Sequence, residues 1–358
     1  MNRIYQVQLG RFTVLTVLSV ITFLAGFSSR LVLHVYSEGT YSVSSVIQRL
    51  ISGIVPFPLG DFLYLILILY IIRSIYLFGK KISLKRLKNG EGIKISLQVL
   101  NFILLLYLLF KVLWGLNYSR PSVTKQLAIG NEKYTTAQLV DLGRYFIAQL
   151  NALQHVEKIR FSVAELQNEA KAGFQSMEQV NPFFSYPAPV VKPVLNSWII
   201  TKIGIEGYYN PLSGEANVNM RLPTVALPFV TCHEIAHQLG IAREDEANLI
   251  GYLVASHSRQ PYFRYSAAYA MLKSILFEIR IKSPGDYEKL QQTINSTTLK
   301  DFKNDREFWR KYNNQMFGYL DVAFDRFLKL NNQAKGTDSY QEIVLWLYNY
   351  HKDDLTNK

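Results

Sequence analysis

The chain has 358 residues, of which 49 % are hydrophobic and only 18 % are charged, and its formal net charge is +12. Such a large apolar fraction excludes an intrinsically disordered chain, and so few charges argue against a plain nucleic-acid-binding protein. The one cysteine, Cys232, excludes an internal disulfide bond.

Most of the positive excess lies in the first third of the chain. Residues 1–117 carry 12 Lys and Arg against three acids, whereas residues 118–358 carry 27 against 24. The same third holds three long runs that are apolar on all sides. A helix needs about 20 apolar residues to cross a bilayer. Buried core helices of a soluble protein are the alternative, but most helices of soluble proteins keep a polar face. We therefore predict an α-helical membrane anchor with spans at about 12–30, 60–79 and 95–115.

A cleaved signal peptide is the alternative for the first run. The run is long for the apolar region of such a peptide, and no clear small-residue cleavage site precedes Arg30. We therefore expect an uncleaved span.

The loop between the second and third runs sets the expected orientation. It is strongly basic, with Glu91 as its only acid among Lys80, Lys81, Lys85, Arg86, Lys88 and Lys94. Short basic loops stay in the cytoplasm. We therefore expect a multi-pass protein of the cell membrane, with a cytoplasmic N-terminus, an outer loop at 31–58, and residues 118–358 as an extracytoplasmic domain. The basic loop then sets the topology, and we expect no nucleic-acid partner.

The second part of the chain predicts an α-rich α+β domain. A linker at 117–130 precedes helices at 136–156 and 162–179, the latter opened by a capping-box pattern at Ser162 and Glu165. The proline-rich stretch 181–193 excludes a helix. Strands and turns are expected in 194–219, with Trp198–Thr201 favouring β structure and Glu215–Asn219 typical of an edge strand. Helices are expected again at 224–240, 247–257 and 265–281.

The most informative motif is His233-Glu234-x-x-His237. Two histidines four residues apart share one helix face, so both imidazoles can reach a single Zn²⁺. Glu234 can then act as the general base. Residue frequencies alone produce such a motif by chance on the order of once in 100 chains of this size. A buried structural pair of histidines is the alternative interpretation.

A catalytic zinc site needs a third protein ligand, and an acidic cluster follows the motif directly. Glu244 and Asn248 share a helix face, so Glu244 can ligate while Asn248 hydrogen-bonds a ligand. Glu246 is the alternative third ligand. On either assignment, another acid of the cluster lies at the N-terminus of the following helix, where its negative charge stabilises the helix.

This stretch resembles the zincin metallopeptidases. In their gluzincin-like members a Glu-x-x-Ala/Ser-Asp motif follows the first one, and Glu244-Asp-Glu-Ala247-Asn248 matches it with Asn248 in place of the usual Asp. The two motifs also lie closer together than in most gluzincins. The metzincin pattern is rejected because its third histidine corresponds to Arg243. The resemblance implies a zincin-like domain at 118–358 in which Glu244 is the ligand.

The whole layout resembles an uncharacterised family of bacterial multi-pass membrane proteins that carry a domain of unknown function. The residues in question are Trp114-Gly-Leu-Asn-Tyr118, Gly214-Glu-Ala-Asn-Val-Asn219 and the stretch His233–Asn248. The resemblance covers nearly the full chain. It implies a peptidase site with no established substrate.

These observations predict a membrane-anchored zinc metallopeptidase. His233, His237 and Glu244 would hold Zn²⁺, and Glu234 would activate water; peptide or protein substrates are implied by the resemblance alone. Charges in the stretch 238–248 exclude a site within the bilayer. The other function considered is a non-catalytic receptor or scaffold with structural zinc.

A substrate-binding strand is a further expectation. Glu215, Asn217 and Asn219 lie just upstream of the motif, where zincins place the edge strand that pairs with an extended substrate. A plain polar edge strand is the alternative.

Overall fold

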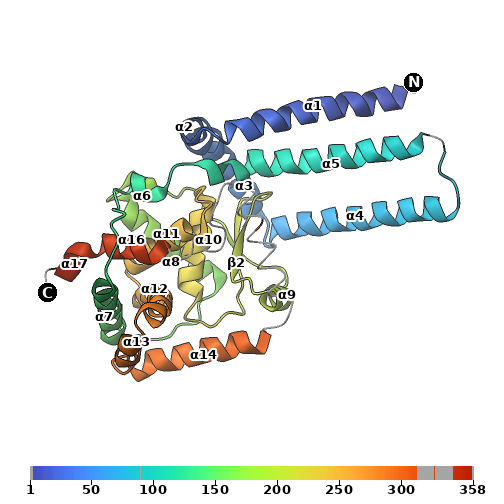
Figure 1. Ribbon diagram of the computed structural model, residues 1–358. Helices are drawn as coiled ribbons and strands as arrows, with labels where there is room; N and C mark the ends of the chain where they lie inside the picture. Colours follow the sequence, from blue (N-terminus) through green and yellow to red (C-terminus); the bar gives the residue numbers. More distant parts are fainter. Residues whose placement is uncertain (1–2, 89, 313–325, 327–341, 357–358) are drawn as a thin grey trace.

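Three long helices project side by side from a mainly helical body (Figure 1). The computed structural model describes residues 3–88, 90–312, 326 and 342–356. The projecting helices are α1 (Arg3–Ala25), α4 (Leu59–Ser83) and α5 (Glu91–Leu113). Helices α1 and α5 pack against each other within the projection.

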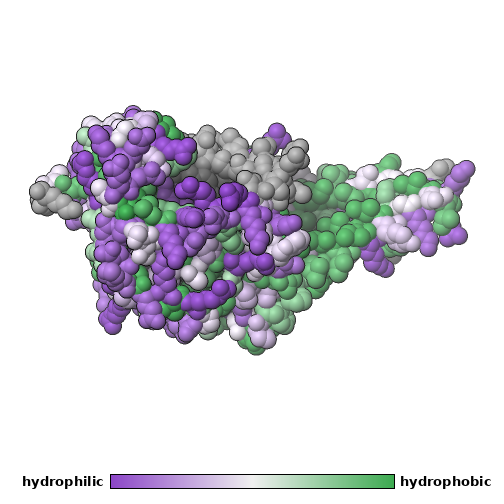
Figure 2. Space-filling view, turned by 90° about the horizontal axis from the view of Figure 1, so that it is seen from below, coloured by the Kyte–Doolittle hydropathy of each residue, from purple (hydrophilic) through white to green (hydrophobic). Residues whose placement is uncertain are grey.

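All three projecting helices are long and apolar enough to cross a membrane, and few of their residues are buried within the described structure. Figure 2 shows their apolar surface between a polar tip and the largely polar body. So large an exposed apolar surface indicates contact with lipid. The three predicted spans are thus confirmed as helices of sufficient length, with ends that differ by several residues. The predicted sidedness remains a prediction.

The connection between α1 and α4 is helical. It contains α2 (Ser29–Leu31), the π-helix η1 (Val32–Thr40) and α3 (Tyr41–Ile54). We expected only an outer loop here. The polar side of α3 is buried against the body, so this segment is part of the packing around the candidate site.

The body is built around α10 (Leu227–Gln238), α11 (Glu244–Ser256) and α12 (Pro261–Lys282), which pack on one another. These are the helices predicted at 224–240, 247–257 and 265–281. The other described helices of the body are η2 (Gly115–Ser119), α6 (Val123–Gln126), α7 (Thr136–Ala152), α8 (Val163–Glu178), η3 (Pro182–Phe184), α9 (Ser197–Lys202), α13 (Pro284–Gln291), α14 (Ser296–Tyr312), α16 (Glu342–Tyr350) and α17 (Lys352–Thr356).

Local signals placed α7 and α8 within a few residues of their predicted ranges. The capping box predicted at Ser162 and Glu165 opens α8. The expected linker at 117–130 is wrong at its start, because Asn117 and Arg120 are buried. Their side chains and those of their neighbours pack where α10 ends, so the chain leaving α5 cannot be solvated.

A three-stranded sheet in the described part of the body lies beside α10. It consists of β1 (Val191–Pro193), β2 (Gly207–Asn210) and β3 (Glu215–Val218), in the order β1-β3-β2. Strand β3 runs antiparallel to β2 and parallel to β1. The expectation of an edge strand at 215–219 is therefore wrong. The tight turn at Gly214 pairs β3 with β2, and the distant strand β1 covers its other edge.

The β-structure expected for Trp198–Thr201 is also wrong, because these residues belong to α9. The side chain of Asn196 accepts hydrogen bonds from the backbone N–H groups of Trp198 and Ile199, both at 3.1 Å. This N-cap satisfies the first free donors of a helix. Strand propensity is a weak, context-dependent preference that such a cap can override.

Candidate metal centre

Three potential ligand atoms converge where α10 and α11 meet. His233 Nε2 and His237 Nε2 lie 3.2 Å apart. The Oε2 atom of Glu244 is 3.3 Å from His233 Nε2 and 3.8 Å from His237 Nε2. The structure thus brings together the two predicted histidine ligands and the first choice for the third ligand.

Two glycines allow this convergence. Gly240 has a φ of +77°, which reverses the chain between α10 and α11 with little steric cost. At Gly251 on α11, a Cβ would lie 3.1 Å from the backbone nitrogen of His233. Because no side chain intervenes there, α11 packs directly on α10, and Glu244 at its start faces the histidines.

The spacing of these atoms matches that of a tetrahedral zinc site. Ligands held at ~2.0–2.1 Å from one zinc ion in tetrahedral geometry are separated by ~3.3 Å. The three measured separations range from 3.2 to 3.8 Å. Independently of Glu244, the ligand atoms of His233, Glu234 and His237 all lie within 4.8 Å of one another and could hold a metal ion.

A backbone hydrogen bond fixes the orientation of His237. Its Nδ1 lies 2.6 Å from the carbonyl oxygen of Ile241. Since a carbonyl oxygen only accepts, Nδ1 carries a proton, and in the neutral form of the ring the lone pair is therefore on Nε2. Metal-binding histidines commonly show this arrangement. The ring of His237 thus presents its free nitrogen to His233 and Glu244.

Burial and neighbouring charges act in opposite directions on the pKa values at the centre. Burial alone would lower the pKa of His237, but the adjacent Glu244 and Glu234 raise it to about 9. Burial lowers the pKa of His233, although the adjacent Glu244 and Asn248 side chains act to raise it. Burial alone would raise the pKa of Glu244, but the adjacent His237 and His233 outweigh this and lower it. Glu244 is therefore an ionised carboxylate between two histidine rings. Asn248 lies beside His233, and its hydrogen bond to a metal ligand remains a prediction.

Glu234 has a different environment from Glu244. It is buried, and its Oε2 has no hydrogen-bond partner among the described residues. Burial raises the pKa of Glu234 to about 8, with Glu244 and Glu206 adding to the shift and His237 opposing it. A buried polar atom without a partner is costly and needs a water, an ion or a ligand. Glu234 is thus a buried carboxyl group with one oxygen left open to a water, an ion or a ligand.

The alternative third ligand points elsewhere. Oε1 of Glu246 accepts hydrogen bonds from the backbone N–H of Val123 at 3.1 Å and from Nη1 of Arg243 at 3.2 Å. Its side chain is fully buried, and these contacts satisfy Oε1, whereas Oε2 has no hydrogen-bond partner among the described residues. Glu246 therefore connects α11 to the start of α6, while Glu244 faces the histidines.

The predicted substrate-binding residues lie away from this centre. Strand pairing places Gly207 and Tyr209 on one side of β2, and Tyr208 on the other side together with Glu215 and Asn217 of β3. The first side meets α10, because a Cβ on Gly207 would lie 2.6 Å from Glu234 Oε1. The second side meets the beginning of α4, so Glu215 and Asn217 cannot approach the histidines.

Hydrogen bonds show what these residues do instead. Glu215 accepts from the backbone N–H groups of Leu59 at 3.0 Å and Gly60 at 2.8 Å, which open α4. The Asn219 side chain donates to Oγ1 of Thr201 at 2.8 Å. All three predicted residues are fully buried. Their expected place on a substrate-pairing edge is wrong, because the strand is central and its polar side faces the anchor.

Sequence reasoning missed the side chains that hold the end of α10. Nε1 of Trp114 donates to the carbonyl oxygen of His237 at 3.3 Å. The Tyr41 hydroxyl and Nη1 of Arg49 each donate to the carbonyl oxygen of Gln238 at 3.0 Å. These groups occupy carbonyls that a helix C-terminus leaves free. Of these three residues, only Trp114 belongs to a motif noted in the sequence. No local pattern marks Tyr41 or Arg49.

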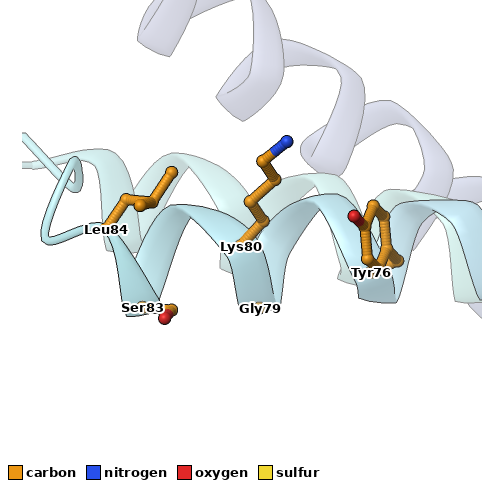
Figure 3. Close-up of a pocket in the computed structure, with 5 residues that line it drawn as sticks. All are labelled: Tyr76, Gly79, Lys80, Ser83 and Leu84. Carbon is orange, nitrogen blue, oxygen red and sulfur yellow. The ribbon is translucent and has the colours of Figure 1, made fainter.

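One surface hollow has no relation to the centre. It lies at the end of α4 that is distant from the body and is lined by Tyr76, Gly79, Lys80, Ser83 and Leu84 (Figure 3). It offers neither a histidine nor a carboxylate. We therefore do not consider it a candidate site.

Comparison with known proteins identifies a family. A family model described as "Protein of unknown function (DUF3810)" matches residues 36–348. The match includes α3, both candidate histidines and Glu244. No curated protein and no solved structure matched the chain. Because the family model covers most of its length, the chain belongs to the DUF3810 family of proteins of unknown function.

Proposed function

We propose that this protein is a membrane-anchored zinc metallopeptidase with His233, His237 and Glu244 as metal ligands. The main support is the spacing of their ligand atoms, 3.2 to 3.8 Å, beside a carboxyl group with an unpartnered oxygen. Two imidazole nitrogens and one carboxylate oxygen favour zinc over magnesium or calcium, which prefer oxygen ligands. Three protein ligands also leave a coordination position open, as catalytic zinc sites require.

The proposed chemistry assigns the proton transfers to Glu234. When bound, a zinc ion supplies Lewis-acid activation of water and of a carbonyl group. Glu234 accepts the proton of the attacking water and delivers it to the leaving amine nitrogen as the peptide C–N bond breaks. A cation among the ligands would lower the pKa of Glu234 from about 8 and so favour the ionised base.

The proposed location is the outer face of the cell membrane. The basic loop between α4 and α5 lies at the end of the projection away from the body (Figure 1). If that loop is cytoplasmic, the body and its candidate centre are extracytoplasmic. A reporter fused after Lys88 should therefore report the cytoplasm, and an external signal there would contradict this orientation.

Metal content and peptide cleavage test the proposal on the full chain in nanodiscs. We expect about one zinc per chain in the wild type and in Glu234→Gln, and almost none in His233→Ala. His155→Ala is the matched control, because His155 is an exposed histidine and should not affect zinc. Cleavage of a peptide library should fall by about 10²–10⁴-fold in Glu234→Gln, the usual contribution of a general base.

Two outcomes would contradict the proposal in different ways. Retention of zinc by His233→Ala would show that the metal assignment is wrong. Stoichiometric zinc in the wild type without cleavage of any library peptide would favour a receptor or scaffold with structural zinc.

A further inference from the structure

Helix α3 has its polar and apolar sides reversed relative to a helix of a soluble protein. Five large apolar side chains recur at helical spacing and are between 51 % and 82 % exposed: Val43, Ile47, Leu50, Ile51 and Ile54. The buried side is polar and consists of Tyr41, Ser45, Arg49 and Ser52. A soluble helix places its apolar stripe on the core. The exposed side of α3 therefore needs an apolar partner outside the body.

The polar side of α3 is matched to the body by specific hydrogen bonds. Arg49 donates from Nε to the carbonyl oxygen of Ala188 at 3.1 Å and from Nη1 to that of Gln238 at 3.0 Å. Gln48 donates to the carbonyl oxygen of Pro211 at 2.8 Å. With its charge satisfied in this way, α3 cannot rotate to bury its apolar side without losing these bonds. The exposed orientation is thus set by the body.

The position of α3 identifies the partner. The helix lies at the junction between the projecting helices and the body (Figure 1). It ends at Ile54, and the candidate span α4 begins at Leu59. Only four residues separate the two helices, so lipid around α4 beyond its buried first turn also reaches the apolar side of α3.

A second apolar patch lies beside the start of α4. Leu195, Trp198 and Ile199 are each about half exposed, and the backbone N–H of Leu195 donates to Asp61 in the first turn of α4 at 2.8 Å. Nζ of Lys202 lies 4.4 Å from the centre of the Trp198 ring. Tryptophan with lysine is typical of the lipid–water interface.

We propose that α3 is an interfacial helix, which inserts its apolar side chains into the bilayer surface where α4 enters. The polar side of α3 simultaneously binds the carbonyl oxygen of Gln238, at the end of the helix that carries both candidate ligands. The candidate metal centre is therefore held at the membrane surface by α3. This inference does not require the centre to be catalytic.

Depth measurements with a fluorescent probe test the proposal. The probe, an environment-sensitive maleimide, is attached to Ile47→Cys, Ile51→Cys or Ile54→Cys in the full chain in phosphatidylcholine nanodiscs. The native Cys232 is fully buried, so the unmodified protein serves as the labelling blank. Glu288→Cys on α13 is the water-exposed control, because α13 lies on the side of the body away from the projection (Figure 1). Ile68→Cys, in the middle of α4, is the deep control.

Quenchers in water and at two depths in the lipid distinguish the outcomes. We expect shallow lipid-attached quenchers to quench the probe at all three α3 positions, at a depth of about 5–10 Å. This depth is smaller than that of the probe at Ile68→Cys, and the probe at Glu288→Cys should not be quenched by either lipid quencher. Quenching by iodide equal to that at Glu288 would overturn the proposal. Protection from both iodide and lipid quenchers would also overturn it, since a second copy of the chain would then cover α3. Ile54, the most exposed of the three, still reports if a substitution at Ile47 or Ile51 disturbs packing.

Discussion

The two sides of the small sheet belong to different parts of the molecule. The side with Gly207 and Tyr209 faces α10 and the candidate metal centre, and we call it the centre side. The side with Tyr208, Glu215 and Asn217 faces the start of α4, and we call it the anchor side. Each side brings a buried carboxylate into contact with the strands.

These two carboxylates differ in how well they are satisfied. On the anchor side, Glu215 accepts from Leu59, Gly60 and the Ser213 hydroxyl, and both of its oxygens are used. On the centre side, Glu234 has an oxygen without a partner among the described residues. A satisfied buried carboxylate is a structural feature, whereas an unsatisfied one requires another explanation. The comparison therefore separates a carboxylate that attaches α4 to the sheet from one whose free oxygen is left beside the candidate metal centre.

The largest expected effect concerns the centre itself. Glu244→Ala should weaken zinc binding by about 100-fold or more, because it removes one of three proposed ligands. Glu246→Ala is the matched control: it should leave zinc affinity nearly unchanged but lower the free energy of unfolding by about 1–3 kcal/mol, since Val123 and Arg243 lose their acceptor. Zinc titration and thermal unfolding of both variants provide the two readouts. A greater loss of affinity in Glu246→Ala would reverse the ligand assignment.

The next effect concerns the anchor side. Glu215→Ala should lower the free energy of unfolding by about 2–3 kcal/mol, because two backbone donors at the start of α4 become buried without a partner. Zinc affinity of the folded protein should stay within about twofold of the wild type, at a cost under ~0.5 kcal/mol. Glu38→Ala, which removes an exposed acid, is the control for thermal unfolding. If Glu215→Ala lost zinc without losing stability, the anchor side would contribute to zinc binding.

The smallest effect concerns contact across the centre side. In Gly207→Ala the new Cβ would lie 2.6 Å from Oε1 of Glu234, so this carboxyl group must move. If the proposed peptidase activity is present, its rate should fall by about tenfold through misplacement of the base, with zinc content unchanged. Gly285→Ala is the control because a Cβ there meets no other atoms. An unchanged rate in Gly207→Ala would indicate that the position of Glu234 is not critical.

Much of the secondary structure could be predicted because it depends on local patterns. The spans follow from uninterrupted apolar runs, and α8 from the capping box at Ser162. Helix α10 could be placed because its apolar residues and the glycine at 240 lie within one short stretch. The two histidines then necessarily share a face, whatever the rest of the chain does.

Prediction failed where the outcome depends on distant residues. Glu215–Val218 has the alternation of an edge strand, but β1 pairs with it from more than 20 residues away and buries it. The residues of α3 were assigned to a loop, because nothing nearby in the sequence shows that Arg49 would meet the carbonyl groups of Ala188 and Gln238. The exposed apolar side of α3 likewise has meaning only once its polar side is buried.

The sequence by itself determined the three apolar helices, the helix that bears His233 and His237, and the set of acids that follows it. The apolar helices depend on uninterrupted apolar runs, and the helix with the histidines and the acids after it depends on spacing within one or two turns. Only the tertiary structure decided that Glu244 faces the histidines while Glu246 holds Arg243, and that β3 turns its polar side to the anchor. Those choices depend on which backbone donors and acceptors are left free when distant elements pack, and a buried carboxylate is most stable where it meets them.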